Sequence, residues 1–471
     1  MLSNAKLTSS YPWSDGSVCR SVRIGRQRTQ PLEAANIPFS QMTNFRAQHT
    51  HNRVCIVLLL IVLGGATYLT VLTQPFIEDD FHNIMLARDY GPVGRWFGAF
   101  DDEVNRVRMT TWVMTSFIES VFGLYPPAFY AFSILIHILN CLLVYMLGAW
   151  RLIGYRTSSW AAIFFAVYEG HQEAVMWYSA CNELLLFVFG LLAFNCWLRF
   201  LELGARRWLW FTGAIVAFFL TLLSKESSVI IVPLMVLPLL SERADLRRYF
   251  YLLPFVVIAA VYTYFIIETR RSSFRFSDGS FDLGAPFWIT WSRSMFSLFW
   301  FWGLLAVGVL LYFREHLKLL FWSLVWCGIS FVPYMFLLYM TRVPSRQTYL
   351  ASAGLALIVG AALALLWTKV RTRQGTAAFA ALVLVMCAAN VGYLWTKKRG
   401  QYLERARPTE QLIEAVAKTD GPIYVECFPR PQIVADSAVA VALNRPFGTL
   451  IWNTPANMIP ENATRVCISG N

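Results

Sequence analysis

The sequence predicts an all-α polytopic membrane protein. Of its 471 residues, 57% are hydrophobic and only 14% are charged, and 18 Trp and 36 Phe add to the apolar content. Apolar windows long enough to cross about 30 Å of hydrocarbon recur along most of the chain. A chain of this composition is solvated mostly by lipid, which excludes an ordinary water-soluble domain.

The apolar windows predict about 11 transmembrane helices, separated by loops that carry most of the charged residues. The predicted spans are residues 54–73, 127–150, 159–177, 184–201, 208–223, 228–240, 249–267, 291–313, 319–340, 349–367 and 377–395. Together they form a transmembrane domain over residues 54–396, with a long first loop at about 75–126.

Residues 108–123 are apolar, but the segment contains Glu119 and is too short to span a membrane. We expect an amphipathic helix that lies in the interface. With this segment flat, the basic loops fall on one side together with the basic N-terminal tail, which the positive-inside rule places in the cytoplasm. These loops contain Arg151, Arg156, Arg199, Arg206, Arg207, Arg243, Arg247, Arg248, Arg314, Lys318, Lys369, Arg371 and Arg373.

The two ends of the chain have ordinary polarity. Residues 1–53 are predicted to be a largely disordered basic cytoplasmic tail, and residues 397–471 a small extracytoplasmic segment with a helix at 397–418 and strands at 421–428 and 448–453. Cys427 and Cys467 are the cysteines that would face an oxidising compartment, and a disulfide between them stays an open alternative. The net charge of +12 comes from the tail and the inner loops and does not indicate nucleic-acid binding.

Three adjacent carboxylates, Glu78, Asp79 and Asp80, follow directly on the first span. Neighbouring acids repel one another, and at least one relieves this repulsion by holding a proton or finding a cation. A general base is often made in this way. The predicted topology places these acids on the extracytoplasmic side, together with the 171–183 stretch, Lys225 and the 341–348 loop.

Four sequence blocks carry a family resemblance over about residues 54–368. They are QPFIEDDFHNI, FGLYPPAFYAFSILIHILNCLLVY, AIFFAVYEGHQEAVMWYSACNELLLF, and LLSKESSVIIVPL taken together with SRQTYLASAGLAL. In this order they resemble the GT-C class of polyprenyl-phosphate-sugar-dependent membrane glycosyltransferases. The similarity is to the membrane domain of the tetratricopeptide-bearing protein O-mannosyltransferases and, more distantly, to the aminoarabinose-lipid A transferases. The chain departs from the first group because no tetratricopeptide repeat follows the last span, and EGHQ stands in place of HPxH.

The resemblance implies a GT-C fold and the inverting transfer of a hexose or pentose from a polyprenyl-phosphate sugar to a hydroxyl of an extracytoplasmic glycan, lipid or protein. A carboxylate in line behind the anomeric carbon would accept the proton of the acceptor. We assign this role to Asp79, with Asp80 as its neighbour and alternate. The other interpretation is a solvated acidic loop that caps the following helix.

A fixed cation would stabilise the negative charge that develops on the departing phosphate. The resemblance implies this role for Lys225 and for Arg346 with Tyr349. The alternatives are a lysine that snorkels to the interface and an ordinary surface arginine.

Besides the base and the phosphate-binding cations, further residues of the predicted pocket would bind the sugar or orient the acceptor. Its predicted members are Glu78, His171, Glu173, Asn182 and Glu183. No cofactor is required, although a divalent metal ion held by His171, Glu173 and Asp79 stays an alternative. His137 and Asn140 lie one turn apart inside a span, which favours an interhelical hydrogen bond.

Two other function classes remain open, a multispan transporter and a metal-dependent outer-leaflet phosphotransferase or hydrolase. The chain has no internal repeat of the kind common in transporters. We expect a multi-pass protein of a bacterial plasma membrane with its active site on the extracytoplasmic face. Its partners would then be the polyprenyl-phosphate sugar, the acceptor and membrane lipid.

Overall fold

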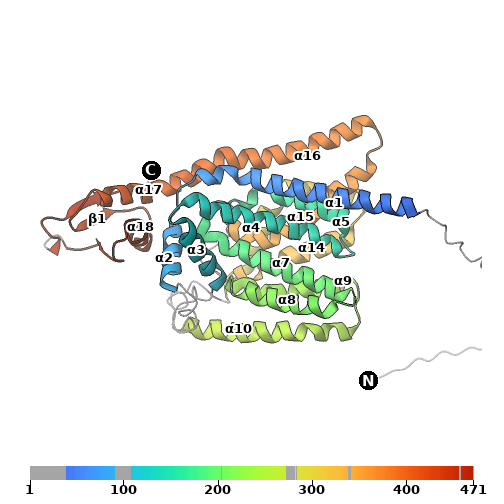
Figure 1. Ribbon diagram of the computed structural model, residues 1–471, viewed down its shortest axis with the longest axis horizontal. Helices are drawn as coiled ribbons and strands as arrows, with labels where there is room; N and C mark the ends of the chain where they lie inside the picture. The colour runs from blue at the N-terminus through green and yellow to red at the C-terminus, as the bar shows by residue number, and fades with distance from the viewer. Residues whose placement is uncertain are drawn as a thin grey trace, which may run out of the picture. The chain divides into compact units, whose positions relative to one another are not determined.

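The computed structural model describes residues 39–90, 108–202, 204–271, 282, 284–337, 341–455 and 458–469. The chain divides into two units, Met1–Asn52 and Arg53–Asn471. Most of the predicted tail, residues 1–53, lies outside the described residues, and its last part is the beginning of helix α1 (Phe39–Tyr68). The second unit contains a bundle of long apolar helices, which makes the chain a multi-pass membrane protein (Figure 1).

Seven helical runs in the described part of the chain are long and apolar enough to cross a membrane. They are Arg53–Thr73, Pro126–Ala149, Tyr178–Leu201, Leu246–Glu268, Leu317–Tyr334, Ser345–Lys369 and Arg373–Ala417. Helices α12 (Phe287–Phe299) and α13 (Trp302–Phe313) are bent by 81° relative to each other and would form an eighth span if they cross together. These eight correspond to eight of the predicted spans.

The other three predicted spans coincide with shorter helices, and their crossing of the membrane stays a prediction. They are α5 (Gly154–Val167), α8 (Arg207–Leu222), and α9 (Ile231–Ser241) with the 3-10 turn η7 (Glu226–Ile230) before it. Helix α5 is largely buried among other helices, so its apolar length does not have to match the thickness of a bilayer.

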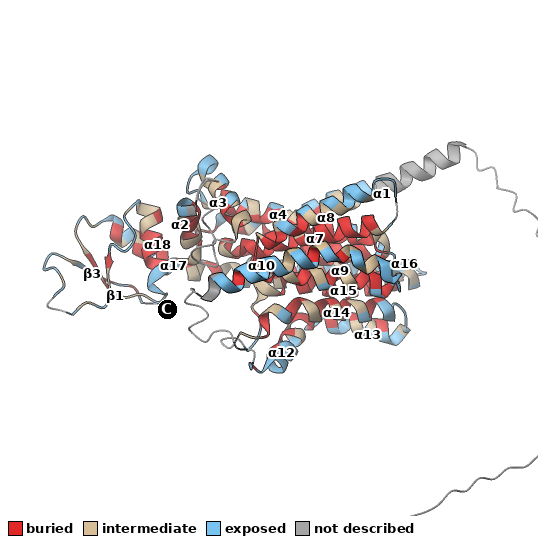
Figure 2. Cartoon of the chain, turned by 90° about the horizontal axis from the view of Figure 1, so that it is seen from below, coloured by how far each residue is buried: buried red, intermediate tan, exposed pale blue. Residues whose placement is uncertain are grey.

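Helix α15 (Tyr349–Lys369) is the buried centre of the bundle and packs against α5, α13 and α14 (Leu317–Phe331). A Cβ atom on Gly360 would lie 2.6 Å from the backbone oxygen of Thr157 in α5, and one on Gly354 would lie 2.7 Å from that of Ser323 in α14. Small residues therefore let three helix backbones approach closely. Figure 2 shows the buried residues concentrated on α7 (Cys181–Leu201) and α15, whereas outer helices such as α10 (Leu253–Arg271) are largely exposed.

Helix α4 (Pro126–Met146) packs against α5 and α7 (Cys181–Leu201). Its two N-terminal prolines suit the first helical turn, where the missing N–H groups have no intrahelical acceptor. Helix α7 packs in turn against α8, and α10 (Leu253–Arg271) runs beside α8. The long helices thus align in one bundle, and their ends define two opposite faces (Figure 1).

Two short helices, α2 (Asp79–Tyr90) and α3 (Met109–Phe122), lie across one end of the bundle (Figure 1). They pack against each other, and Arg88 in α2 pairs with Glu119 in α3 at 2.6 Å. Helix α3 occupies the segment predicted to be flat, and its 14 residues are too few to cross a bilayer. Its position in the membrane interface stays a prediction.

The C-terminal segment continues the last long helix without a break. Helix α16 (Arg373–Tyr393) passes through a π-helical turn, η11 (Leu394–Lys398), into α17 (Arg399–Ala417). A small parallel sheet follows, in the order β2-β1-β3, with strands β1 (Ile423–Cys427), β2 (Leu450–Ile451) and β3 (Thr464–Cys467) and helix α18 (Gln432–Leu443). The disulfide between Cys427 and Cys467 is present. It joins β1 to β3.

Candidate active site

The candidate active site begins where the chain turns from the first span into α2. Glu78 occupies the left-handed backbone region, with φ 47°, which costs about 1–2 kcal/mol for a residue with a side chain. Asp79 and Asp80 then form the first turn of α2. The turn points the three adjacent acids into three different environments.

Asp80 is completely buried and its carboxylate is saturated with hydrogen bonds. It accepts from the backbone N–H of Ile77 at 2.8 Å, from that of Ser179 at 2.7 Å, and from the hydroxyl of Tyr130 at 3.2 Å. Burial raises the pKa of Asp80 to about 7, although the three donors oppose the shift. These contacts make Asp80 a link between α2, α4 and the loop before α7, and they leave no oxygen facing a substrate.

Glu78 is buried and paired with two arginines from the C-terminal segment. Arg405 of α17 donates to both of its oxygens, at 3.1 and 2.6 Å, and Arg430 lies at 2.9 Å. Helix α18 also packs on α2, where Ser437 lies 3.2 Å from the Nδ1 atom of His82. The C-terminal segment is therefore part of this site. Arg405 and Arg430 were not predicted from the sequence.

Glu173 is held against the 3-10 turn η10 (Ser345–Thr348). It accepts from the Ser345 hydroxyl and the backbone N–H of Arg346, both at 3.1 Å, and it pairs with the Arg346 guanidinium. The guanidinium groups of Arg346 and Arg405 lie 4.9 and 4.5 Å from the centroid of the Trp177 ring. Trp177 thereby holds both cations in place through cation–π contacts.

The Asp79 carboxylate lies within the electrostatic field of the neighbouring charged residues, Glu78, Arg346 and Arg405, but forms no hydrogen bond or ion pair with them. Among the described residues, no hydrogen bond or ion pair engages its half-buried carboxylate. Burial and the adjacent Glu78 raise the pKa of Asp79, whereas His82, Arg346 and Arg405 lower it, and the net shift is upward. A raised pKa and a carboxylate without a bound donor are the properties of a general base.

Lys225 and Glu183 form a separate buried ion pair, with side-chain exposures of 8% and 4%. The ammonium group lies 5.4 Å from the centroid of the Tyr334 ring, and burial lowers the pKa of Lys225 while Glu183 opposes the shift. Asn182 is buried beside Glu183, and Arg108 at the start of α3 pairs with Glu226 at 2.8 Å. Each charge in this group is neutralised by a neighbour.

His171 and Tyr349 lie inside the bundle. The His171 Nε2 atom is 2.7 Å from the Ser352 hydroxyl, and the Tyr349 hydroxyl is 2.7 Å from the Nδ1 atom of His137. Both side chains are at most 1% exposed, and they pack against each other with ring centroids 4.4 Å apart. These contacts favour a packing role for the two residues, which the structure does not bring to the carboxylate cluster.

The predicted interhelical role of His137 and Asn140 is confirmed. His137 of α4 contacts Tyr349 of α15, and Asn140 donates to the Leu184 oxygen of α7 at 3.2 Å. The described residues contain no group of three or more His, Cys, Asp or Glu residues placed to hold a metal ion.

A cavity of about 1170 Å³ adjoins the cluster on the side of η10. Its lining includes Ser345, which hydrogen-bonds to Glu173, and Arg342, Arg293 and Lys398 give it a basic wall.

A sequence signal existed for the basic residues at 397–407. Lys and Arg cluster there after the last predicted span, on the side where the positive-inside rule expects few of them.

No protein-family model matches the chain, and no curated protein matches it in sequence. Solved structures do resemble it. ArnT from Cupriavidus metallidurans in the apo state aligns over 87% of each chain with TM-score 0.52 and 14% identity. ArnT bound to undecaprenyl phosphate aligns with TM-score 0.50 and 13% identity, over 82% of this chain and 84% of ArnT.

The archaeal oligosaccharyltransferase AglB from Archaeoglobus fulgidus, in complex with an inhibitory peptide and a dolichol-phosphate, aligns with TM-score 0.51 and 12% identity. The alignment covers 85% of this chain and 65% of AglB. At these identities the likeness shows the fold. The fold is that of the GT-C membrane glycosyltransferases, as the sequence blocks predicted.

Proposed function

We propose that this protein is an inverting glycosyltransferase. It would move a hexose or pentose from a polyprenyl-phosphate donor to a hydroxyl of an extracytoplasmic glycan, lipid or protein. The observation that carries the proposal is Asp79, a half-buried carboxylate with a raised pKa that no described side chain or N–H group engages. The undecaprenyl phosphate bound to ArnT and the dolichol-phosphate bound to AglB support a lipid phosphate as the donor carrier.

In the proposed reaction, Asp79 accepts the proton of the acceptor hydroxyl as its oxygen forms a bond to the anomeric carbon. The bond from that carbon to the phosphate oxygen breaks, and the electron pair leaves with the polyprenyl phosphate. A single displacement inverts the anomeric centre. The donor already has a good leaving group, so the reaction needs a base for the acceptor more than an acid for the phosphate.

Negative charge on the departing phosphate requires a cation fixed near the reacting atoms. Arg346 fits this role because Glu173 and Trp177 orient its guanidinium beside Asp79. The adjoining cavity, with Arg293, Arg342 and Lys398 in its wall, is large enough for a sugar phosphate. The predicted phosphate contacts of Lys225 and Tyr349 and the sugar contacts of His171, Asn182 and Glu183 stay predictions.

The site would face the extracytoplasmic side of a bacterial plasma membrane, where lipid-linked sugars meet glycan, lipid and protein acceptors. No cofactor is required by this chemistry. The deciding experiment uses mass spectrometry of envelope glycans, glycolipids and glycoproteins in a strain without the gene, complemented by wild-type protein or variants. We expect a specific hexose or pentose to disappear on deletion and to return with the wild-type gene.

Asp79→Asn should fail to restore the sugar, with transfer lowered about 10²- to 10⁴-fold, the usual contribution of a general base. Asp420→Asn, the same chemical change at an exposed residue of the C-terminal segment, is the matched control and should restore it. Both variants are first checked for equal abundance in the membrane. Full restoration by Asp79→Asn would refute the assignment of the base.

A further inference from the structure

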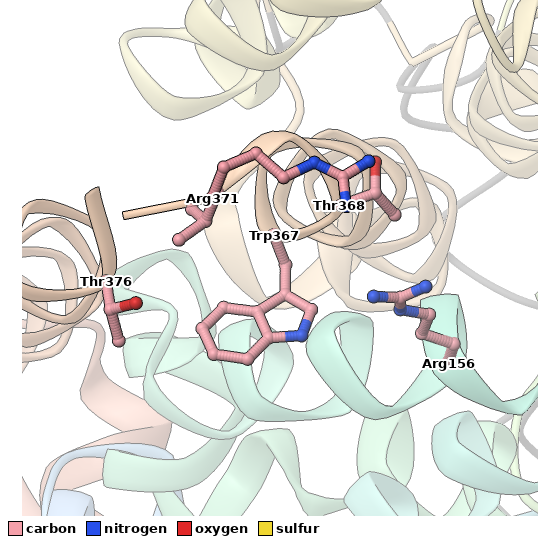
Figure 3. Close-up of a pocket in the computed structure, with 6 residues that line it drawn as sticks. Arg156, Trp367, Thr368, Arg371 and Thr376 are labelled. Carbon is pink, nitrogen blue, oxygen red and sulfur yellow. The ribbon is translucent and has the colours of Figure 1, made fainter. Parts of the chain in front are cut away.

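A second hollow, of about 430 Å³, lies where α15 ends and α16 begins, beside the first turn of α5. Its lining is Arg156, Trp367, Thr368, Val370, Arg371 and Thr376. Figure 3 shows the Trp367 ring between Thr376 and Arg156, with the guanidinium of Arg371 beside Thr368. The link between α15 and α16 lies at the end of the bundle opposite to α2 (Figure 1).

The hollow combines an aromatic floor with a cationic rim. Phe379 of α16 packs against Trp160 of α5 and Trp367 of α15, with ring centroids 5.2 Å apart in each pair. This aromatic cluster joins the three helices and fixes the relative positions of the residues around it. Trp367 is 40% exposed, as is typical of a tryptophan at the boundary between lipid and water.

The side chain of neither rim arginine has an ion pair or a hydrogen bond with another described residue. The neighbouring Lys369, by contrast, pairs with Glu315 at 2.8 Å. Arg156 and Arg371 are exposed, but both lie beside the wall of one small hollow, so their positive potentials add there.

The helix N-termini near the two arginines also favour an anion at this place. Arg156 lies in the first turn of α5, and Arg371 lies two residues before the start of α16. Both N-terminal turns lack an acidic residue, and α5 has no side-chain cap, whereas Thr372 caps α16 by accepting from the Gly375 N–H. A helix N-terminus carries partial positive charge, which disfavours a cation and favours an anion. The N-terminus of α5 and the two arginine side chains thus favour the same kind of ligand, an anion.

We propose that this hollow binds the phosphate group of an anionic phospholipid in the leaflet opposite to the carboxylate cluster. Arg156 and Arg371 would bind the phosphate oxygens, because a guanidinium matches phosphate geometry. The hydroxyls of Thr368 and Thr376 also line the hollow, but they donate to the backbone oxygens of Leu365 and Thr372, so the two arginines are the donors to the phosphate. The acyl chains would follow the lipid-facing side of α16, where Leu384 and Val385 are 69% and 59% exposed. A membrane lipid is favoured over a soluble phosphate because an interfacial tryptophan forms the floor.

The test is native mass spectrometry of the full chain released from nanodiscs that contain equal amounts of phosphatidylglycerol and phosphatidylcholine. We expect phosphatidylglycerol to be retained in preference. The double variant Arg156→Gln/Arg371→Gln should weaken its binding by about fivefold for each arginine removed, since a basic residue near an anionic lipid contributes about that factor. Both arginines are exposed and unpaired, so the fold should tolerate the change.

Arg373→Gln is the matched control for Arg371, because it removes one arginine two residues further along, at the first residue of α16, which does not line the hollow. It should retain phosphatidylglycerol as the wild type does. Equal loss in the control and the double variant would overturn the site, as would equal retention of the two lipids by the wild type, a result that depends on no variant. Binding of inorganic phosphate as tight as that of phosphatidylglycerol would overturn the assignment to a lipid.

Discussion

Two charged clusters at the same end of the bundle differ in how completely their charges are paired. Around Lys225, each described cation has a carboxylate of its own, Glu183 for Lys225 and Glu226 for Arg108. Around Asp79, the arginines are occupied by Glu78 and Glu173, and Asp79 is left within their field without a bond. The comparison teaches that a carboxylate has to remain unpaired in the folded chain before it can accept a proton from a substrate.

The first prediction tests the cluster around Lys225, in which every described cation is paired. Lys225→Met leaves Glu183 buried without its partner and should lower the free energy of unfolding by about 3–5 kcal/mol, the usual cost of breaking a buried pair. The measurement is the thermal or denaturant unfolding of the purified protein in detergent.

The double variant Lys225→Met/Glu183→Met should recover most of this loss, because it removes both charges together. If Lys225→Met instead leaves stability unchanged and only weakens the use of the donor, the pair is an open phosphate site and the contrast with Asp79 fails.

The second prediction concerns the disulfide that closes the C-terminal sheet. Replacing both Cys427 and Cys467 by Ser should destabilise this segment by about 2–5 kcal/mol, as is usual for a native disulfide. Limited proteolysis should then cut within residues 418–469 before it cuts the bundle. Sugar transfer should fall as well, because Arg430 follows β1 and pairs with Glu78. Unchanged sugar transfer together with rapid proteolysis would show that the candidate active site does not depend on the folded sheet.

The third prediction concerns Arg405. Arg405→Gln should lower sugar transfer about tenfold, since a lost charge-assisted hydrogen bond costs about 1.5–3 kcal/mol. Arg405 also lowers the pKa of Asp79, so its removal should raise that pKa further and move the acid limb of the pH–rate profile to higher pH. Arg407→Gln, two residues along α17 and exposed, is the matched control and should change neither quantity.

The smallest effect is expected from Glu78→Gln, and it has the opposite sign. The proposed base, Asp79, must be ionised to accept a proton, so activity should be lost as the pH falls through its raised pKa. Glu78 is one cause of that raised pKa, and its neutralisation should move the acid limb to lower pH. The check is the same pH–rate profile. A shift in the same direction for Glu78→Gln and Arg405→Gln would mean that another group controls this limb.

The positions of Asp79, Glu173 and Arg346 were predicted from local sequence blocks, and the structure brings these three together. Local sequence could not separate Asp79 from Asp80, because their difference lies in donors from Ser179 and Tyr130, which are far away along the chain. It could not assign Arg405 or Arg430 either. Those residues reach Glu78 only because α16 continues into α17 and carries the C-terminal segment back to α2.

The sequence by itself determined that this chain crosses a membrane and where its long apolar helices lie, because lipid solvation imposes a length and a composition that can be read locally. The GT-C fold was predicted from the family resemblance of four sequence blocks. The tertiary structure alone decided which charged residues form ion pairs with one another and which carboxylate stays unpaired. Pairing depends on distances of a few ångströms between residues from distant parts of the chain, and on burial, which sets the cost of every unpaired charge.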